Sequence, residues 1–159
     1  MKKIKLYLLA TLLIVGFTYG CTQSEKETTT EPDKVENVIL FIGDGMGVTQ
    51  IYAGMTVSEK PLVFEEFRHI GFQKTFSADN YVTGSAASGT ALATGKKTKN
   101  DRVGVGPNGE EFTSILKIAE QNGLATGLVS TSSIVHATPA AFIANNEKRY
   151  NYSDLANDF

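Results

Sequence analysis

The sequence contains very little histidine, cysteine or tryptophan. Its 159 residues include two histidines (His69 and His136), one cysteine (Cys21) and no tryptophan. A single cysteine excludes an intramolecular disulfide and a cysteine-based zinc finger. The formal net charge is only −2, from 15 Lys and Arg against 17 Asp and Glu. That balance excludes a polybasic nucleic-acid binder, so we expect no nucleic acid as a specific partner. The length suits a single domain.

The N-terminal apolar run is too short for a bilayer-spanning helix, which needs about 20 residues. This run, residues 6–17, follows a basic start and is typical of the h-region of a secretory signal. Cys21 then follows Thr18-Tyr19-Gly20, which resembles a bacterial lipoprotein cleavage site, with Thr18 where Leu is usual. We expect export to the periplasm or cell envelope, with a lipid anchor at Cys21 as the only membrane attachment. Ordinary signal cleavage, with Cys21 lost or idle, is the alternative.

The composition divides the chain into three parts. Residues 1–20 are interpreted as a signal peptide of lipoprotein type. Residues 21–36 are interpreted as a polar tether, because this stretch is too polar and charged to bury enough surface to fold. Residues 37–159 remain as the folded portion.

Strand-type and helix-type patterns alternate within this folded portion. Continuous apolar runs at 38–42 and 124–131 are typical of strands buried on both faces, and 69–76 alternates weakly. Helices are predicted over 48–57, 85–94 and 112–121. This order predicts an α/β fold with a largely parallel central sheet flanked by helices, incomplete in this chain. Ligands bind beyond the carboxyl ends of such strands, where Asp44 and the polar segment 130–138 fall.

Four blocks, in order along the chain, resemble the alkaline phosphatase family. NVILFIGDGMG at 37–47 resembles the family's first strand and its metal-binding aspartate. YVTGSAASGTALATG at 81–95 resembles the nucleophile motif, in which a serine precedes Ala-Ala at the start of a helix. HATPAA at 136–141 resembles the block with a magnesium-site hydroxyl, and RYNYSD at 149–154 the block whose arginine binds phosphate. The four blocks together are specific, whereas any one alone is not.

The resemblance implies a role for one residue of each block. Ser85 would be the nucleophile, forming a phosphoserine that water hydrolyses, with zinc activating its hydroxyl; a helix N-cap is its structural alternative. Asp44 would bridge one zinc ion and the magnesium ion, or simply form a turn. Thr138 would give its hydroxyl to the magnesium site, although Thr before Pro139 is also a good N-cap pair. Arg149 would bind two phosphate oxygens, or be a surface arginine.

Further expectations come from the same resemblance. His136 would lie near the magnesium site without binding the metal directly, and His69 is interpreted as structural. The implied cofactors are two Zn²⁺ ions and one Mg²⁺ ion, the substrates are small phosphate monoesters, and the full-length protein would be a homodimer. The family's zinc ligands come from the later part of a longer chain. We therefore interpret residues 37–159 as the N-terminal portion of a catalytic domain and expect it to be inactive alone.

Two alternative functions stay open at this point. A phosphodiesterase or sulfatase of the same metal-dependent superfamily is one, although such enzymes usually use Thr or a modified Cys in another sequence context. An exported lipoprotein that binds a ligand without catalysis is the other, and it is favoured by the short length and the missing zinc ligands. Zinc content would separate this binding protein from the enzyme.

Overall fold

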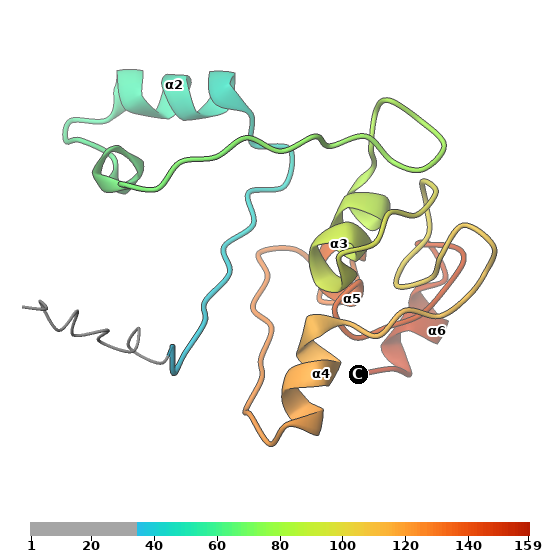
Figure 1. Cartoon of the computed structure of the whole chain (residues 1–159). Coiled ribbons are helices and arrows are strands. Elements are labelled where there is room, and N and C mark those ends of the chain that lie inside the picture. The colour runs from blue at the N-terminus through green and yellow to red at the C-terminus, as the bar shows by residue number, and fades with distance from the viewer. Residues whose placement is uncertain (1–34) are drawn as a thin grey trace, which may run out of the picture. The chain divides into compact units, whose positions relative to one another are not determined.

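The computed structural model describes residues 35–159 (Figure 1). The predicted signal peptide, Cys21 and nearly all of the predicted tether lie outside these residues. The chain divides into two compact units, 1–41 and 42–159. Of the first unit only residues 35–41 are described, and they form exposed, extended backbone. The second unit holds all the helices of the described residues.

Six helical elements follow one another between residues 48 and 156. They are α2 (Val48–Val57), the 3₁₀ helix η1 (Val63–Glu66), α3 (Ser85–Thr94), α4 (Ile115–Gln121), α5 (Ala137–Ala140) and α6 (Tyr152–Ala156). The predicted helices at 48–57 and 85–94 are confirmed over their full ranges. Within residues 35–159 no helix combines the length and the apolar character needed to cross a bilayer.

The third predicted helix begins three residues later than expected. Ser114 caps the N-terminus of α4, because its hydroxyl accepts a hydrogen bond from the Lys117 backbone N–H. The same hydroxyl donates to the backbone carbonyl of Phe142. Phe112, the first residue of the predicted helix, lies before the cap. It is buried there, and its N–H donates to the Gly104 carbonyl at 2.8 Å.

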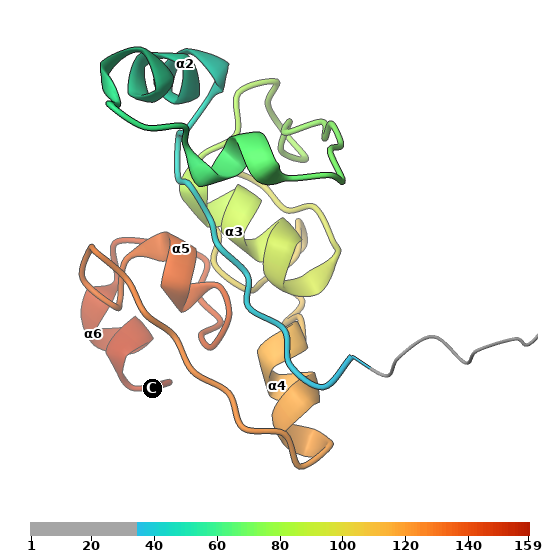
Figure 2. The same ribbon diagram turned by 90° about the vertical axis from the view of Figure 1, so that its left-hand side faces the viewer.

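The predicted sheet is not confirmed in the described part of the chain. Segments 38–42, 69–76 and 124–131 contain no assigned strand, and Figures 1 and 2 draw them as unpaired tubes. A β-strand requires a hydrogen-bonded neighbour, and within residues 35–159 none of the three segments has one. In the part of the chain that the structure describes, strand-like pairing is confined to two isolated antiparallel bridges, Val103 with Asn146 and Val105 with Glu111.

The core is built from small side chains where α3 packs against α5. The two helices lie side by side in Figures 1 and 2, and α4 also contacts α3. Gly89 of α3 is the point of closest approach: a Cβ there would lie 3.2 Å from the Ala141 Cβ and 3.3 Å from the Thr138 Cα. The buried cluster comprises Ala86, Val103, Ala137, Ala140, Ala141, Ala144 and Leu155. Small residues therefore fix α3 and α5 to each other.

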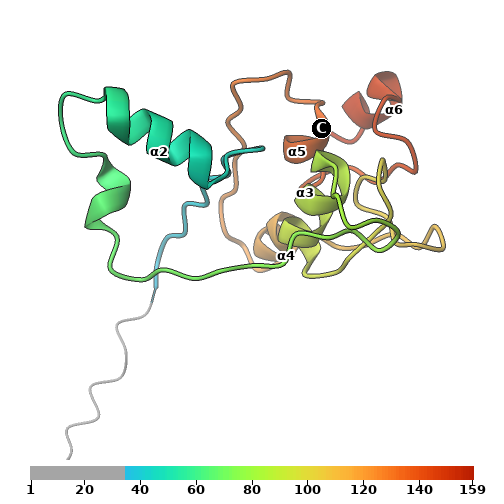
Figure 3. The ribbon, with the colours of Figure 1, turned by 90° about the horizontal axis from the view of Figure 1, so that it is seen from above.

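The last described residues return to this core. The chain ends beside α5 and α6, as all three views show (Figure 3). Leu155 of α6 is fully buried in the cluster, and the Asp158 carboxylate accepts a hydrogen bond from the Asn145 N–H at 3.1 Å. The segment between α5 and α6, which includes Arg149, is thus held at both ends.

Candidate active site

Ser85 and Arg149 lie in direct contact, although 64 positions separate them in the sequence. The Arg149 Nη1 donates a hydrogen bond to the Ser85 Oγ at 2.9 Å. The Arg149 backbone N–H donates to the Asp101 carbonyl at 2.8 Å. Its Nε is buried and has no hydrogen-bond partner in residues 35–159. A guanidinium beside a serine hydroxyl, with its buried Nε–H unused, is suited to binding the oxygens of an anion.

Ser85 is the first residue of α3 and not its cap. The N-cap is Gly84, which has extended backbone angles (φ −88°, ψ 163°). The first backbone hydrogen bond of the helix runs from the Ser88 N–H to the Gly84 carbonyl at 3.0 Å. The N–H groups of Ser85, Ala86 and Ala87 therefore have no partner within the helix. These free donors and the helix dipole favour an anion at the position of the Ser85 hydroxyl.

Asp44 and Thr138, predicted to share a metal, also lie in contact. The Thr138 hydroxyl donates to the Asp44 Oδ2 at 2.8 Å across 94 positions of sequence. Asp44 is exposed in a turn in which the Met46 N–H donates to the Gly43 carbonyl, and Gly45 has a positive φ of 67°. Only glycine adopts that φ without strain. The N-cap of α5 is His136, so the alternative assignment of Thr138 as N-cap is wrong.

A carboxylate beside a hydroxyl fits a hard cation better than zinc. Oxygen donors of this kind are the ligands that Mg²⁺ prefers. The described residues contain no group of three or more His, Cys, Asp or Glu side chains that could hold a metal ion. A zinc ion needs about four ligands, mostly His, Cys or carboxylate. The residues present therefore fit part of a magnesium site and do not fit the predicted zinc pair.

The described contacts of His136 do not explain a role for it in the candidate site. Its ring stacks on Tyr152, with ring centres 5.9 Å apart and planes at 6°. Within residues 35–159 its side chain makes no hydrogen bond to Asp44 or Thr138. Its place near the magnesium ion stays a prediction, based on the resemblance of this position to one in the alkaline phosphatase family.

Asn100, which the sequence motifs did not single out, holds the backbone that leads into Ser85. Its Oδ1 accepts a hydrogen bond from the Gly84 N–H at 2.8 Å, and its Nδ2 donates to the Val82 carbonyl at 3.0 Å. Its own N–H donates to the Asp79 Oδ1 at 3.0 Å, and the Ser77 hydroxyl donates to the same oxygen at 2.9 Å. In the sequence, the only indication of this role for Asn100 is that two polar loops, 77–80 and 99–102, flank the serine motif.

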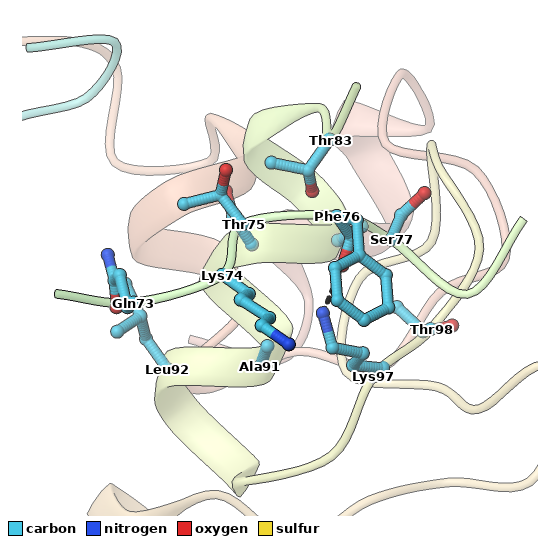
Figure 4. A pocket seen from close by; sticks show the side chains of 12 residues that line it. Gln73, Lys74, Thr75, Phe76, Ser77, Thr83, Ala91, Leu92, Lys97 and Thr98 are labelled. Atoms are coloured by element: carbon cyan, nitrogen blue, oxygen red, sulfur yellow. Dashed lines mark hydrogen bonds between the residues drawn. The ribbon is translucent and has the colours of Figure 1, made fainter. Parts of the chain in front are cut away.

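A separate cavity lies between segment 73–77 and the side of α3 that carries Ala87, Ser88, Ala91 and Leu92 (Figure 4). Neither Ser85 nor Arg149 lines it. Lys97 closes one side, since its Nζ lies 3.4 Å from the centre of the Phe76 ring and donates to the Phe76 carbonyl. This cavity holds no carboxylate, histidine or cysteine, so we do not assign the chemistry to it.

Comparison with known proteins decides the family. The family model described as alkaline phosphatase matches residues 35–158. The chain belongs to the alkaline phosphatase family. Alkaline phosphatase 4 of Bacillus subtilis is 45% identical over 148 residues, which are 86% of this chain and 32% of that protein. The chain spans about a third of the length of two such curated relatives, alkaline phosphatases 4 and 3 of Bacillus subtilis.

The solved structures of alkaline phosphatases show the same fold. The enzyme from the Antarctic bacterium TAB5 superimposes with a TM-score of 0.71 at 39% identity, over 72% of this chain and 34% of that one. A mutant of the TAB5 enzyme with magnesium bound gives the same TM-score at 38% identity, over 72% and 33% of the two chains. The fold of the described residues is therefore alkaline-phosphatase-like.

Proposed function

We propose that the complete protein is a metal-dependent hydrolase of small phosphate monoesters that acts through a phosphoserine at Ser85. The single observation that carries this proposal is the 2.9 Å hydrogen bond from Arg149 to the Ser85 Oγ at the N-terminus of α3. Membership of the alkaline phosphatase family supports it.

The residues of the candidate site then have defined tasks in the reaction. The Ser85 Oγ attacks phosphorus as the ester P–O bond breaks; the serine loses its proton, and the departing alcohol oxygen gains one. Arg149 and the free N–H groups of α3 bind the non-bridging oxygens, whose charge they stabilise through the transition state. Water then attacks the phosphoserine, releasing inorganic phosphate and restoring the hydroxyl. Catalysis centred on the phosphoryl group gives little selectivity for the alcohol.

The proposed metal set is two Zn²⁺ ions and one Mg²⁺ ion per site. Asp44 and Thr138 would hold the magnesium ion, a role supported by their 2.8 Å contact and by the magnesium-bound TAB5 mutant. Bound divalent cations supply positive charge that favours the ionised form of an attacking hydroxyl. The described residues do not fit a zinc pair, so the zinc ligands would come from the rest of the complete protein.

The remaining expectations are proposals about the complete protein. They are export to the periplasm or cell envelope, lipid attachment at Cys21, a tether at 21–36 and a homodimer. The central parallel sheet, with 38–42, 69–76 and 124–131 as strands, belongs with them, and the TM-score of 0.71 to complete alkaline phosphatases supports it.

Replacing Ser85 with alanine in the complete, metal-loaded protein tests the proposed function. We expect hydrolysis of p-nitrophenyl phosphate to fall by at least about 10³-fold, and labelled phosphate to be trapped on Ser85 of the wild type after acid quenching. Ser88→Ala is the matched control, because the Ser88 hydroxyl bonds to the Gly84 carbonyl and not to Arg149. Undiminished activity of Ser85→Ala would refute the proposal. A complete protein without zinc or serine labelling would favour the ligand-binding lipoprotein.

A further inference from the structure

The turn at Asn100 and Asp101 connects the two partners of the candidate site. The Asn100 side chain holds the backbone just before Ser85, and the Asp101 carbonyl accepts the Arg149 N–H at 2.8 Å. Ser85 and Arg149 thus each depend on one of two adjacent residues, neither of which touches the Ser85 hydroxyl.

The Asn100 amide bridges the backbone segment that leads into α3. Gly84 has no side chain, so helix α3 has no side-chain cap. The Asn100 Oδ1 satisfies the Gly84 N–H from a position 16 residues away, while the Nδ2 holds the Val82 carbonyl. With both ends of the amide used, segment 82–84 is held in one orientation, which sets the direction in which the first turn of α3 presents Ser85.

The turn itself is rigidly anchored. Asp101 adopts a positive φ of 68°, the only non-glycine residue among 35–159 to do so. Such a conformation is unfavourable for a residue with a Cβ and persists where the surroundings fix it. Two hydrogen bonds hold the turn. The Asn100 N–H donates to the Asp79 carboxylate, which also accepts from the Ser77 hydroxyl, and the Arg149 N–H donates to the Asp101 carbonyl.

We propose that Asn100 is a positioning residue that sets the geometry between Ser85 and Arg149 for phosphoryl transfer; this inference rests on the proposed function. A misplacement of about 1 Å at a reacting atom can cost about 100-fold in rate. Losing the Asn100 bridge frees the backbone next to Ser85. Without the Asn100 side chain, the Arg149 N–H still donates to the Asp101 carbonyl. We therefore expect the loss to slow the attack by Ser85 more than it weakens phosphate binding by Arg149.

The test compares Asn100→Ala and Asn100→Asp in the complete, metal-loaded protein. We expect Asn100→Ala to lower kcat/KM for p-nitrophenyl phosphate by about 10- to 100-fold, with a slower phosphorylation of Ser85 in quenched-flow experiments. The inhibition constant for inorganic phosphate and the metal content should change little. Asn100→Asp keeps an acceptor for the Gly84 N–H and should recover part of the phosphorylation rate. Any repulsion by its carboxylate would appear in the inhibition constant instead.

Asn108→Ala is the matched control, since Asn108 lies in an exposed turn where its side chain makes no hydrogen bond to another described residue. It should behave as the wild type. Wild-type kinetics in Asn100→Ala would overturn the inference, as would equal loss of phosphorylation rate in both Asn100 variants. If Asn100→Ala does not fold, the phosphorylation rate of Asn100→Asp is compared with that of Asn108→Ala. A slower phosphorylation of Ser85 in Asn100→Asp supports the inference, and an equal rate overturns it. An active Ser85→Ala protein would instead refute the proposed function itself.

Discussion

Asp79 is the residue whose protonation the surrounding backbone controls most directly. The backbone N–H of Asn100 and then the hydroxyl of Ser77 lower the pKa of its carboxyl, because both donate to the ionised oxygen. The unfolded chain lacks these donors, and its aspartate pKa is about 3.9. The lowered pKa therefore stabilises the folded state above that value, and the contribution is lost as the pH falls through the native pKa.

Replacing Asp79 with asparagine should flatten the acid dependence of stability. Urea unfolding of wild type and Asp79→Asn between about pH 6 and pH 3 should show a difference in the free energy of unfolding that shrinks as the pH falls below about 4. Asp154→Asn is the control, because the Asp154 side chain forms no hydrogen bond within the described residues. Two parallel pH curves for wild type and Asp79→Asn would contradict the assignment.

Residues carried by a motif were predictable, and residues that act through backbone bonds were not. Ser85, Arg149, Asp44 and Thr138 were predicted from four short blocks, and the structure brings them together as two contacting pairs. Their chemical roles stay predictions. Asn100 went unnoticed, because a side-chain bond to a backbone N–H can be made by any polar residue that the fold places there. Only the three-dimensional path of the loop identifies it.

At the scale of the elements, the packing of α3 on α5 leaves little room for a larger side chain at Gly89. Alanine is favoured over glycine in a helix by about 1 kcal/mol, but overpacking costs about 1–3 kcal/mol. The new Cβ would meet the Ala141 Cβ at 3.2 Å and the Thr138 Cα and carbonyl oxygen at 3.3 and 3.4 Å. Two of these are backbone atoms, which cannot rotate away, so the steric cost should exceed the helical gain.

Gly89→Ala should therefore destabilise the protein by about 1 kcal/mol and displace Thr138 from Asp44. In the complete protein, thermal unfolding should show the first effect, and a higher magnesium concentration for half-maximal activity the second. Gly54→Ala is the matched control, because it makes the same change inside helix α2, where a Cβ would meet only the Leu62 Cδ1 at 3.4 Å among the described residues. A Gly89→Ala protein as stable as the wild type, with unaltered magnesium dependence, would show that α5 yields freely.

Helices were predictable from the sequence and strands were not confirmed, for a physical reason. The hydrogen bonds of α2 and α3 are local, so residues 48–57 and 85–94 carry the information for their own structure. The start of α4 depended on a contact from Ser114 to Phe142, 28 positions away, which periodicity does not reveal. A strand needs a partner from elsewhere in the fold, and the described chain provides none for the three predicted segments.

At the scale of the whole molecule, the missing partners leave large apolar side chains in solvent. Val38 is 83% exposed and Phe41 88% exposed, and Phe72 and Val129 are fully exposed. Large apolar side chains left in solvent mark an interaction site or an aggregation liability where they gather. The chain also matches only about a third of the length of Bacillus subtilis alkaline phosphatase 4 and of the TAB5 enzyme. We therefore expect the isolated 159-residue polypeptide to differ from the complete protein.

The isolated polypeptide should be catalytically inactive and loosely packed. Purified 1–159, supplied with zinc and magnesium, should show no turnover of p-nitrophenyl phosphate and no stoichiometric zinc, because the described residues hold no cluster of metal ligands. It should bind the dye ANS and unfold with low cooperativity, as expected of exposed apolar surface. The complete protein under the same conditions is the control and should be active and bind the dye weakly. Robust hydrolysis by 1–159, abolished by Ser85→Ala, would mean that this chain builds its whole site from its own residues.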